Sequence, residues 1–284
     1  MFTTVFWNID SLRDLENDDR EFGRLLSQLC IEHNVDIAVL IECRIPVGQV
    51  LEAFQPRDMY TMIPSQEKFA VIARFDSRFM ERLVPPLSSY RTDYWHLNLP
   101  LQKSAIISAI HGPDRRNNSP AKQELFFQQV ATNISWAERQ VGHSRSIVFG
   151  DFNSNPFESP MGSLSGMHAV SSRSIAGKIS RSCYNVDYPF FYNPMWSLLG
   201  DFRSGDSPPG TYYHDGSNPH EFYWHMLDQV LLRPELCERL RPNGLRIITK
   251  IGDQSLLTRS GIPDRSSASD HLPVLFTLDL RENC

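Results

Sequence analysis

The chain has 284 residues, of which 41% are hydrophobic and 21% charged, a composition typical of a folded protein with a sizeable core and not of a disordered one. Its formal net charge of −5 argues against a protein that coats nucleic acid, because such proteins are usually basic. No stretch is long and apolar enough to cross a bilayer, so we expect no stable membrane association.

The cysteines and the first residues favour a reducing compartment. The five cysteines are scattered without a Cys-x-x-Cys pair, which argues against a disulfide framework and a structural zinc site. The first residues lack the basic segment, apolar run and cleavage site of a signal peptide. We therefore expect a cytoplasmic protein.

The first half of the chain predicts alternating strands and helices. Apolar residues at helical spacing predict a helix over residues 17–34 and a second helix that begins at Ser119-Pro120, an N-cap followed by a first helical residue. Short apolar runs that predict strands occur at Phe2–Ile9, Ile37–Ile41, Phe69–Ala73, Ala105–Ile110 and Ser146–Phe149. This alternation favours an α/β protein in which helices cover sheets.

The second half differs in character. Residues 154–225 are rich in Ser, Pro, Gly, Asn and aromatic residues, with weak periodicity. Two further strands are predicted at Met226–Leu232 and Pro273–Leu280, and the alternation of the second suits a half-exposed sheet. No change of composition resembles a linker, so we expect one domain over residues 1–284.

Polar side chains recur where the apolar runs end, or interrupt one of them. In chain order they are Asn8, Glu42, His111, Asp151 with Asn153, Asp228, and Ser269-Asp270-His271. Each alone could be a turn residue, but buried strands avoid such groups unless they are paired. Together they suggest side chains that converge on one edge of the sheets, where open α/β sheets bind ligands.

The chemistry of this set is coherent. Its carboxylate and carboxamide oxygens suit Mg²⁺ or Mn²⁺ better than zinc, because softer ligands are absent. Its two histidines can act as general acid or base, or can offset charge on a phosphoryl group.

The order N…E…E…H…GDFN…D…SDH resembles the endonuclease/exonuclease/phosphatase superfamily, which has the deoxyribonuclease I-like fold. The most specific pieces are GDFN at residues 150–153 and SDHLPV at residues 269–274, and the likeness runs from Trp7-Asn8 to His271. The resemblance implies a four-layer α/β sandwich, with two packed mixed β-sheets flanked by helices. It also implies hydrolysis of phosphoric esters with a divalent metal.

The resemblance implies a role for each metal-side and water-side residue. Glu42 corresponds to the principal metal ligand, with Asn8 and Asp270 close to the metal. Asp151 would orient or deprotonate the attacking water, with help from Asn153.

It also implies roles for the histidines. His271, buttressed by Asp228, would be the general base or would contact the scissile phosphate. His111 stands where the deoxyribonuclease I branch has its second histidine, and the stretch QEKFAVIAR makes Glu67 its orienting acid. The apurinic-site endonuclease branch has a tyrosine there, so His111 tilts the interpretation away from that branch.

Several residues are candidates for substrate contact. The segment PPGTYYHD, with Thr211 and Tyr212, resembles a family segment near the substrate phosphate. Basic side chains suited to a phosphate backbone are Arg115, Arg116, Arg173, Lys178 and Arg181, although these could also lie in solvated loops. Aromatic residues between 184 and 224 could stack on bases or fill the core.

These observations leave three hypotheses. The first is an endonuclease that uses Mg²⁺ or Mn²⁺ and takes nucleic acid as substrate, although the acidic first 60 residues, with 11 Asp and Glu against 5 Lys and Arg, argue against tight nonspecific binding of duplexes. The alternative is a phosphatase or phosphodiesterase for a small or lipid phosphate, of the inositol phosphate or sphingomyelin type. A scaffold without activity is disfavoured, since the full set of acids and both histidines is present.

Overall fold

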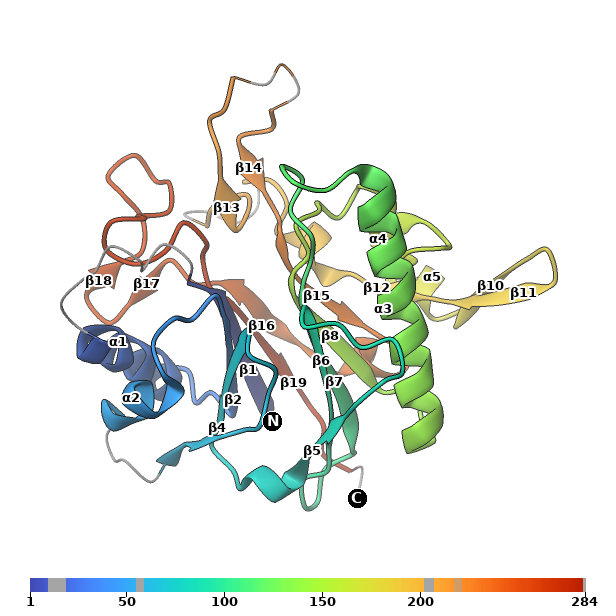
Figure 1. Cartoon of the computed structure of the whole chain (residues 1–284), viewed down its shortest axis with the longest axis horizontal. Coiled ribbons are helices and arrows are strands. Elements are labelled where there is room, and N and C mark those ends of the chain that lie inside the picture. The colour runs from blue at the N-terminus through green and yellow to red at the C-terminus, as the bar shows by residue number, and fades with distance from the viewer. Residues whose placement is uncertain (10–18, 55–58, 202–206, 218, 220, 283–284) are drawn as a thin grey trace.

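Two mixed β-sheets packed face to face form the centre of the molecule (Figure 1). The computed structural model describes residues 1–9, 19–54, 59–201, 207–217, 219 and 221–282. The six-stranded sheet has the order β16-β19-β1-β2-β4-β3, and the seven-stranded sheet has the order β5-β6-β7-β8-β15-β12-β9.

The strands of the six-stranded sheet are β1 (Phe2–Asn8), β2 (Ile37–Ile41), β3 (Thr61–Met62), β4 (Phe69–Ala73), β16 (Leu240–Ile247) and β19 (Val274–Leu278). Those of the seven-stranded sheet are β5 (Met80–Leu83), β6 (Thr92–Leu97), β7 (Ala105–His111), β8 (Ser146–Asp151), β9 (Ala169–Val170), β12 (Phe191–Tyr192) and β15 (Asp228–Leu232). Three hairpins stand apart from the sheets: β10 (Ser180–Cys183) with β11 (Val186–Pro189), β13 (Tyr212–Tyr213) with β14 (Trp224–His225), and β17 (Lys250–Ile251) with β18 (Gln254–Ser255).

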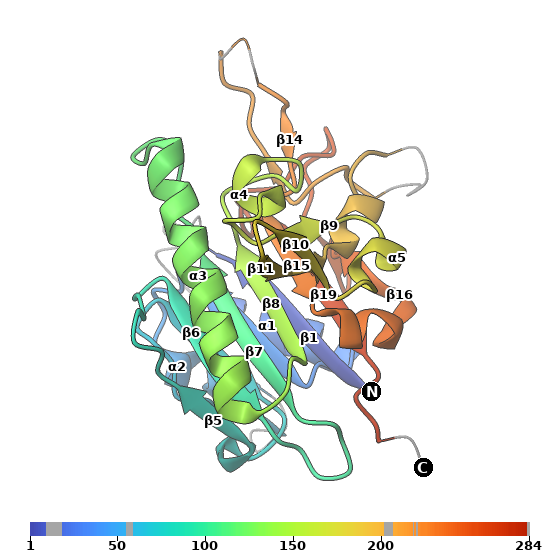
Figure 2. The same cartoon turned by 90° about the vertical axis from the view of Figure 1, so that its right-hand side faces the viewer.

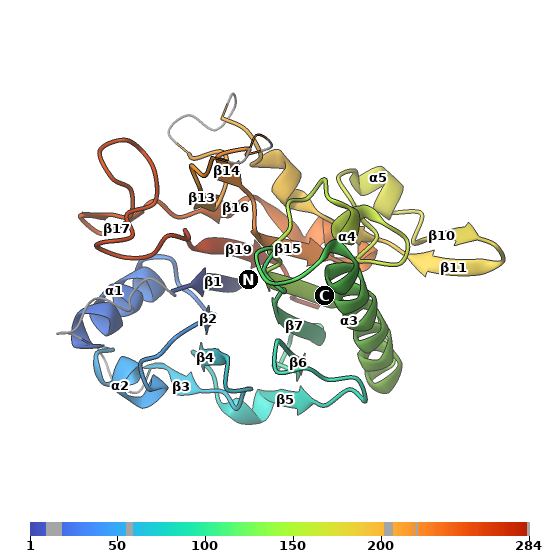
Figure 3. The ribbon, with the colours of Figure 1, turned by 45° about the horizontal axis from the view of Figure 1, so that its top comes forward.

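Helices form the outer layers (Figures 2 and 3). The α-helices are α1 (Asp19–Glu32), α2 (Val47–Glu52), α3 (Pro120–Val141), α4 (Ser159–Gly162) and α5 (Arg173–Ala176), and the 3₁₀ helices are η3 (Ser77–Phe79), η4 (Pro194–Ser197) and η5 (Pro234–Arg239). α1 and α2 lie beside the six-stranded sheet, whereas α3 crosses the outer face of the seven-stranded sheet. The expected four-layer sandwich is therefore confirmed.

Aromatic side chains join the layers. Between the sheets, the Phe149 ring lies 6.0 Å from that of Phe6 and 5.5 Å from that of Phe276. Outside them, the Phe127 ring of α3 stacks on Phe152 at 5.8 Å. These large apolar faces are removed from water, which is the main driving force for packing the layers.

The predicted segments differ from the observed ones in several places. The Ser119 side chain caps α3 as expected, and α1 begins at Asp19, while residues 17 and 18 lie outside the described residues. The expectation of a half-exposed last strand is wrong, because β19 lies between β1 and β16 and four of its five residues are buried. The short strands between 169 and 225 were not predicted, since they depend on long-range pairing.

Within the described residues, no helix is both long and apolar enough to span a bilayer.

Candidate active site

Strand register brings the predicted polar residues to one edge of the two sheets. In the six-stranded sheet, Asn8 lies opposite Ile41, the residue before Glu42. In the seven-stranded sheet, Asp151 lies between His111 on β7 and Asp228 on β15. We call this edge the catalytic edge.

Asp151 is the buried centre of the catalytic edge. One of its oxygens accepts a hydrogen bond from Asn8 Nδ2 at 3.1 Å and one from Asn153 Nδ2 at 3.2 Å. The other accepts from the backbone N–H of Asn153 at 2.8 Å. Burial raises the pKa of Asp151, and the like charge of Asp228 adds to this effect, while the histidines oppose it. Such a carboxylate takes up a proton more readily than an exposed one.

His271 and Asp228 form a buried pair. His271 Nδ1 lies 2.8 Å from Asp228 Oδ2, and both side chains are almost fully buried. Burial disfavours the charged imidazole, but Asp228, Asp151 and Asp270 outweigh it and raise the pKa of His271 to about 10. At neutral pH the ring is therefore an imidazolium, with Nδ1–H donating to Asp228.

Glu42 faces His111 across the two sheets. Glu42 Oε1 lies 3.1 Å from His111 Nε2, and the carboxyl group is 26% exposed. The Glu42 backbone has a φ of 56°, a left-handed conformation that is costly for a side chain of this kind and recurs at functional sites. Among the described residues, His111 Nδ1 has no hydrogen-bond partner although it is buried.

Glu67 does not take the place expected for it. It lies in the exposed turn before β4, and among the described contacts no hydrogen bond or ion pair joins it to His111. The turn instead directs the N–H of Gln66 to Asp93. The acid that the fold brings to His111 is Glu42, because the ends of β2 and β7 meet across the sandwich.

Asn8, Glu42 and Asp270 stand around the end of β1. Ser269 Oγ donates to the Asn8 carbonyl at 2.7 Å and so fixes the segment that carries Asp270. Trp7 Nε1 donates to the His271 carbonyl at 2.9 Å and fixes the other side of this segment. The three side chains offer hard oxygen donors to a cation. A second set is the buried group of Asp151, Asp228 and His271, in which one ligand atom of each lies within 4.8 Å of the others.

Thr211 and Tyr212 contact the His271–Asp228 pair. Thr211 Oγ1 accepts from the backbone N–H of Asp228 at 3.1 Å. Tyr212 pairs with His271 in an isolated β-bridge, and the two ring centroids are 4.7 Å apart. The catalytic edge is thus flanked by the β13–β14 hairpin.

The basic candidates divide into two groups. Arg115 lies near the site, because its Nε donates to the Asn153 carbonyl at 3.4 Å, and it forms an ion pair with Glu158. Exposed Arg116 lies close enough to Tyr212 to lower the pKa of its hydroxyl group, against the effect of burial. Arg173 lies on α5, Lys178 precedes β10, and Arg181 lies on β10. α5 packs beside β12 and the edge strand β9. Arg173 stacks on Tyr192 at 5.5 Å, and Tyr192 pairs with Leu232, at the opposite end of β15 from Asp228. The fold does not bring this second group to the catalytic edge.

Supporting residues escaped the sequence prediction. Trp7 and Asn155 position the segments that carry the candidate catalytic groups, together with Ser269, which the sequence had placed in the polar set. The signals available were the serine before Asp270 and the second asparagine of the stretch after GDFN. His225, whose ring contacts Asn155 and Glu221, had no signal in sequence because its partners come from distant segments.

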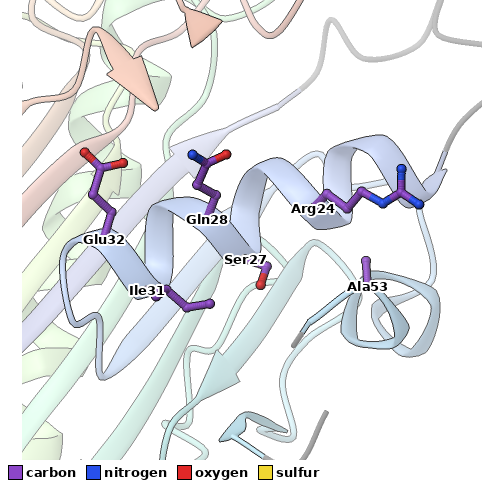
Figure 4. A pocket seen from close by; sticks show the side chains of 6 residues that line it. All are labelled: Arg24, Ser27, Gln28, Ile31, Glu32 and Ala53. Carbon is purple, nitrogen blue, oxygen red and sulfur yellow. The ribbon is translucent and has the colours of Figure 1, made fainter. Parts of the chain in front are cut away.

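A hollow on the outer side of α1 has a volume of about 420 Å³ and is lined by Arg24, Ser27, Gln28, Ile31, Glu32 and Ala53 (Figure 4). None of the candidate site residues lines it. The hollow is therefore separate from the candidate active site.

Comparisons with known proteins show the family of the chain. The sequence model of the Endonuclease/Exonuclease/phosphatase family matches residues 5–271. No curated protein matches the sequence.

Solved structures share the fold. An endonuclease/exonuclease/phosphatase family protein from Bacteroides thetaiotaomicron is 14% identical, with a TM-score of 0.59 and 98% of each chain covered. An AP endonuclease from Archaeoglobus fulgidus is 13% identical, with a TM-score of 0.55, covering 98% of this chain and 100% of its own. The 3′ phosphatase NExo from Neisseria, bound to a product DNA hairpin, is 14% identical, with a TM-score of 0.53 and the same coverage, 98% and 100%.

Proposed function

Because this chain belongs to the Endonuclease/Exonuclease/phosphatase family, we propose that it is a divalent-metal-dependent phosphodiesterase that cuts nucleic acid internally. The observation that carries the proposal is the buried His271–Asp228 pair beside Asp151, at the edge where Asn8, Glu42 and Asp270 also end. The edge thus combines a cationic hydrogen-bond donor, His271, with a proton acceptor, Asp151, and with the oxygen ligands for a cation.

The oxygen donors fit Mg²⁺ or Mn²⁺. Asn8, Glu42 and Asp270 would hold the ion, since carboxylate and carboxamide oxygens are the ligands that hard cations prefer. The buried group of Asp151, Asp228 and His271 fits a cation less well, because an imidazolium already bonded to Asp228 has no lone pair to offer at that nitrogen. When bound, the ion supplies Lewis-acid stabilisation of charge on the phosphoryl group.

The chain's own groups would divide the remaining work. Asp151, held by Asn8 and Asn153, would orient the attacking water and take its proton, which suits a carboxyl group whose pKa is raised. His271, as an imidazolium, would donate from Nε2 to a phosphate oxygen and offset its charge. This favours phosphate contact over the role of general base for His271.

His111 would contribute a second polar contact. Its Nε2 faces Glu42, and its unpartnered Nδ1 has hydrogen-bonding capacity to spare. Glu42 would therefore hold both the ion and the orientation of His111. Thr211 and Tyr212 would line the substrate side, close to His271.

Two considerations support nucleic acid as the substrate. The AP endonuclease and the DNA-bound 3′ phosphatase that share this fold act on nucleic acid by their descriptions. Arg115 and Arg116 lie near the site, where a phosphate backbone would pass.

Parallel hydrolysis assays test the proposal. Purified protein is given supercoiled plasmid, single-stranded DNA, single-stranded RNA or an inositol phosphate, with Mg²⁺, Mn²⁺ or EDTA, beside Asp151→Ala. We expect metal-dependent chain cutting that the variant lacks, by a factor of about 100 or more. Phosphate release from the inositol compound alone would assign the chain to the small-phosphate alternative.

A further inference from the structure

Three exposed aromatic side chains gather beside the catalytic edge. Phe157, Phe222 and Tyr223 are 46%, 59% and 54% exposed. Phe157 comes from the loop after β8, and its ring centroid lies 5.5 Å from that of Phe222, which precedes β14. We call these three residues the aromatic shelf. Exposed apolar groups that gather in this way are typical of a binding surface.

The backbone of the aromatic shelf is strained. Tyr223 has a φ of 61°, and the N–H of Trp224 donates to the Phe222 carbonyl at 2.7 Å, which closes a γ-turn around Tyr223. An aromatic residue in this conformation costs free energy, and burial does not repay it because both rings remain exposed. Strain that keeps two neighbouring rings in solvent points to a function for them.

A polar chain fixes the aromatic shelf to the catalytic loop. Glu221 accepts from the backbone N–H groups of Phe222 and Tyr223, at 3.0 and 3.2 Å, and lies 2.6 Å from His225 Nε2. His225 Nδ1 lies 3.0 Å from Asn155 Nδ2, two residues beyond Asn153. Because Asn155 Nδ2 can only donate, His225 Nδ1 accepts from it, and His225 Nε2–H donates to Glu221. Burial lowers the pKa of His225, although Glu221 opposes this effect.

The aromatic shelf also lies close to the reacting groups. The Tyr213 ring stacks with that of Tyr223, with centroids 6.3 Å apart. Its neighbour Tyr212 contacts the His271 ring at 4.7 Å. The Phe222 ring in turn lies 6.5 Å from that of His225, and the His225 ring lies 6.3 Å from that of Tyr212. A group bound on the shelf would therefore lie near a phosphate that His271 contacts.

Charge around the aromatic shelf does not favour a second phosphate contact. Arg115 is paired with Glu158, while Glu221 and exposed Asp215 add negative charge on the hairpin. The available chemistry is the flat face of aromatic rings, which every nucleobase can stack on once it leaves a duplex.

We propose that the aromatic shelf stacks an unpaired nucleobase adjacent to the scissile phosphate, so that the enzyme selects single-stranded or locally unpaired nucleic acid. This inference rests on the proposed function. In a regular duplex the base faces are covered by their neighbours, so a paired strand cannot use the shelf without unstacking, which costs a few kcal/mol.

Binding without turnover tests the inference. Anisotropy of short fluorescein-labelled strands is measured in EDTA with single-stranded DNA, single-stranded RNA, duplex DNA, and a DNA strand whose bases are replaced by tetrahydrofuran residues. The variants are Phe222→Leu and Phe157→Leu, which keep an apolar side chain but lose the ring. Tyr184→Leu is the matched control, because Tyr184 is 95% exposed on the β10–β11 turn, away from the catalytic edge.

We expect the wild type to bind the base-bearing single strand about tenfold more tightly than the abasic strand and the duplex. Phe222→Leu and Phe157→Leu should each lose most of this preference, and Tyr184→Leu should keep it. The DNA and RNA arms show which sugar the site accepts. Equal affinity for base-bearing and abasic strands in the wild type would overturn the inference, as would an unchanged preference in both shelf variants.

Cleavage of the same strands with Mg²⁺ separates the two proposals. If the wild type cuts nucleic acid but the shelf variants bind normally, only the aromatic shelf assignment fails. If base-dependent binding is present and lost in the variants while no strand is cut, the proposed nuclease activity fails and the shelf assignment stands.

Discussion

At the scale of single residues, the catalytic edge controls charge through burial and pairing. Asp151 has both oxygens occupied by donors, and burial raises its pKa. His271 is buried as well, but three neighbouring carboxylates keep it cationic. A proton acceptor, Asp151, and a proton donor, His271, therefore lie together in one site. Active sites use such pairs to carry out acid and base chemistry at one pH.

The state of His271 gives a pH prediction. Its pKa is raised to about 10, so the cation is present below that value, and we expect the rate to hold until the pH approaches about 10 and then to fall. Asp228→Asn removes the negative charge that most stabilises the His271 imidazolium, so the pKa of His271 should fall. The alkaline loss of activity should then begin at a lower pH. A pH profile of kcat, beside an NMR titration of the His271 ring, measures both. A wild-type ring that titrates near its ordinary value of 6.5 would contradict the assignment.

At the scale of elements, the sequence predicted what local pattern controls. The runs Ile37–Ile41 and Phe69–Ala73 are strands with the predicted bounds, and the cap at Ser119 begins α3. The sequence could not predict which residues meet in space. Glu42 and His111 form a pair although they are 69 positions apart. Nothing in the stretch QEKFAVIAR shows that Glu67 is exposed to solvent. The basic residues Arg173, Lys178 and Arg181 were expected near the substrate for the same reason. In the fold, α5 packs beside β12 and β9, and β10 pairs with β11 outside the large sheets, away from β8.

The close contact of β7 and β8 gives a prediction for one glycine. Gly150 has a φ of 150°, and a Cβ added there would lie 1.9 Å from the Ile110 carbonyl oxygen. Gly150→Ala must separate the two strands, so we expect the free energy of unfolding to fall by more than about 4 kcal/mol.

Gly142→Ala is the control for that measurement. Gly142 ends α3 at a φ of 79° with no atom within 4 Å of an added Cβ, so only the left-handed backbone is penalised, by about 1–2 kcal/mol. Urea unfolding compares the two variants. Equal losses would show that β7 and β8 can move apart at little cost.

At the scale of the whole molecule, acidic groups from both sheets meet at one edge. Glu42 and Asp270 come from loops of the six-stranded sheet, and Asp151 and Asp228 from the seven-stranded sheet. Their mutual repulsion opposes the packing of the sandwich at this edge, and a bound cation would offset it.

Metal binding should therefore stabilise the folded chain. With Mg²⁺ about a hundredfold above its dissociation constant, the gain is about 2.7 kcal/mol, which raises the thermal midpoint by several degrees. Glu42→Ala should reduce this rise, whereas Glu282→Ala, which removes an exposed acid near the end of the described chain, should not. Thermal unfolding with and without Mg²⁺ measures it, and an equal rise in all three proteins would argue against Glu42 as a ligand.

The contacts of Trp7 and Asn8 with residues 269–271 also set the order in which the enzyme becomes active. These contacts join positions more than 260 residues apart, and they hold Asp270 and His271 in place. During synthesis, β1 can pair with β2 early, but β19, its neighbour on the other side, is made more than 260 residues later. A ribosome-bound chain that stops short of residue 269 has no His271 to bring to a phosphate. If the proposed site is correct, it is completed only when its last segment has been translated, so a partly made chain would not yet hydrolyse anything.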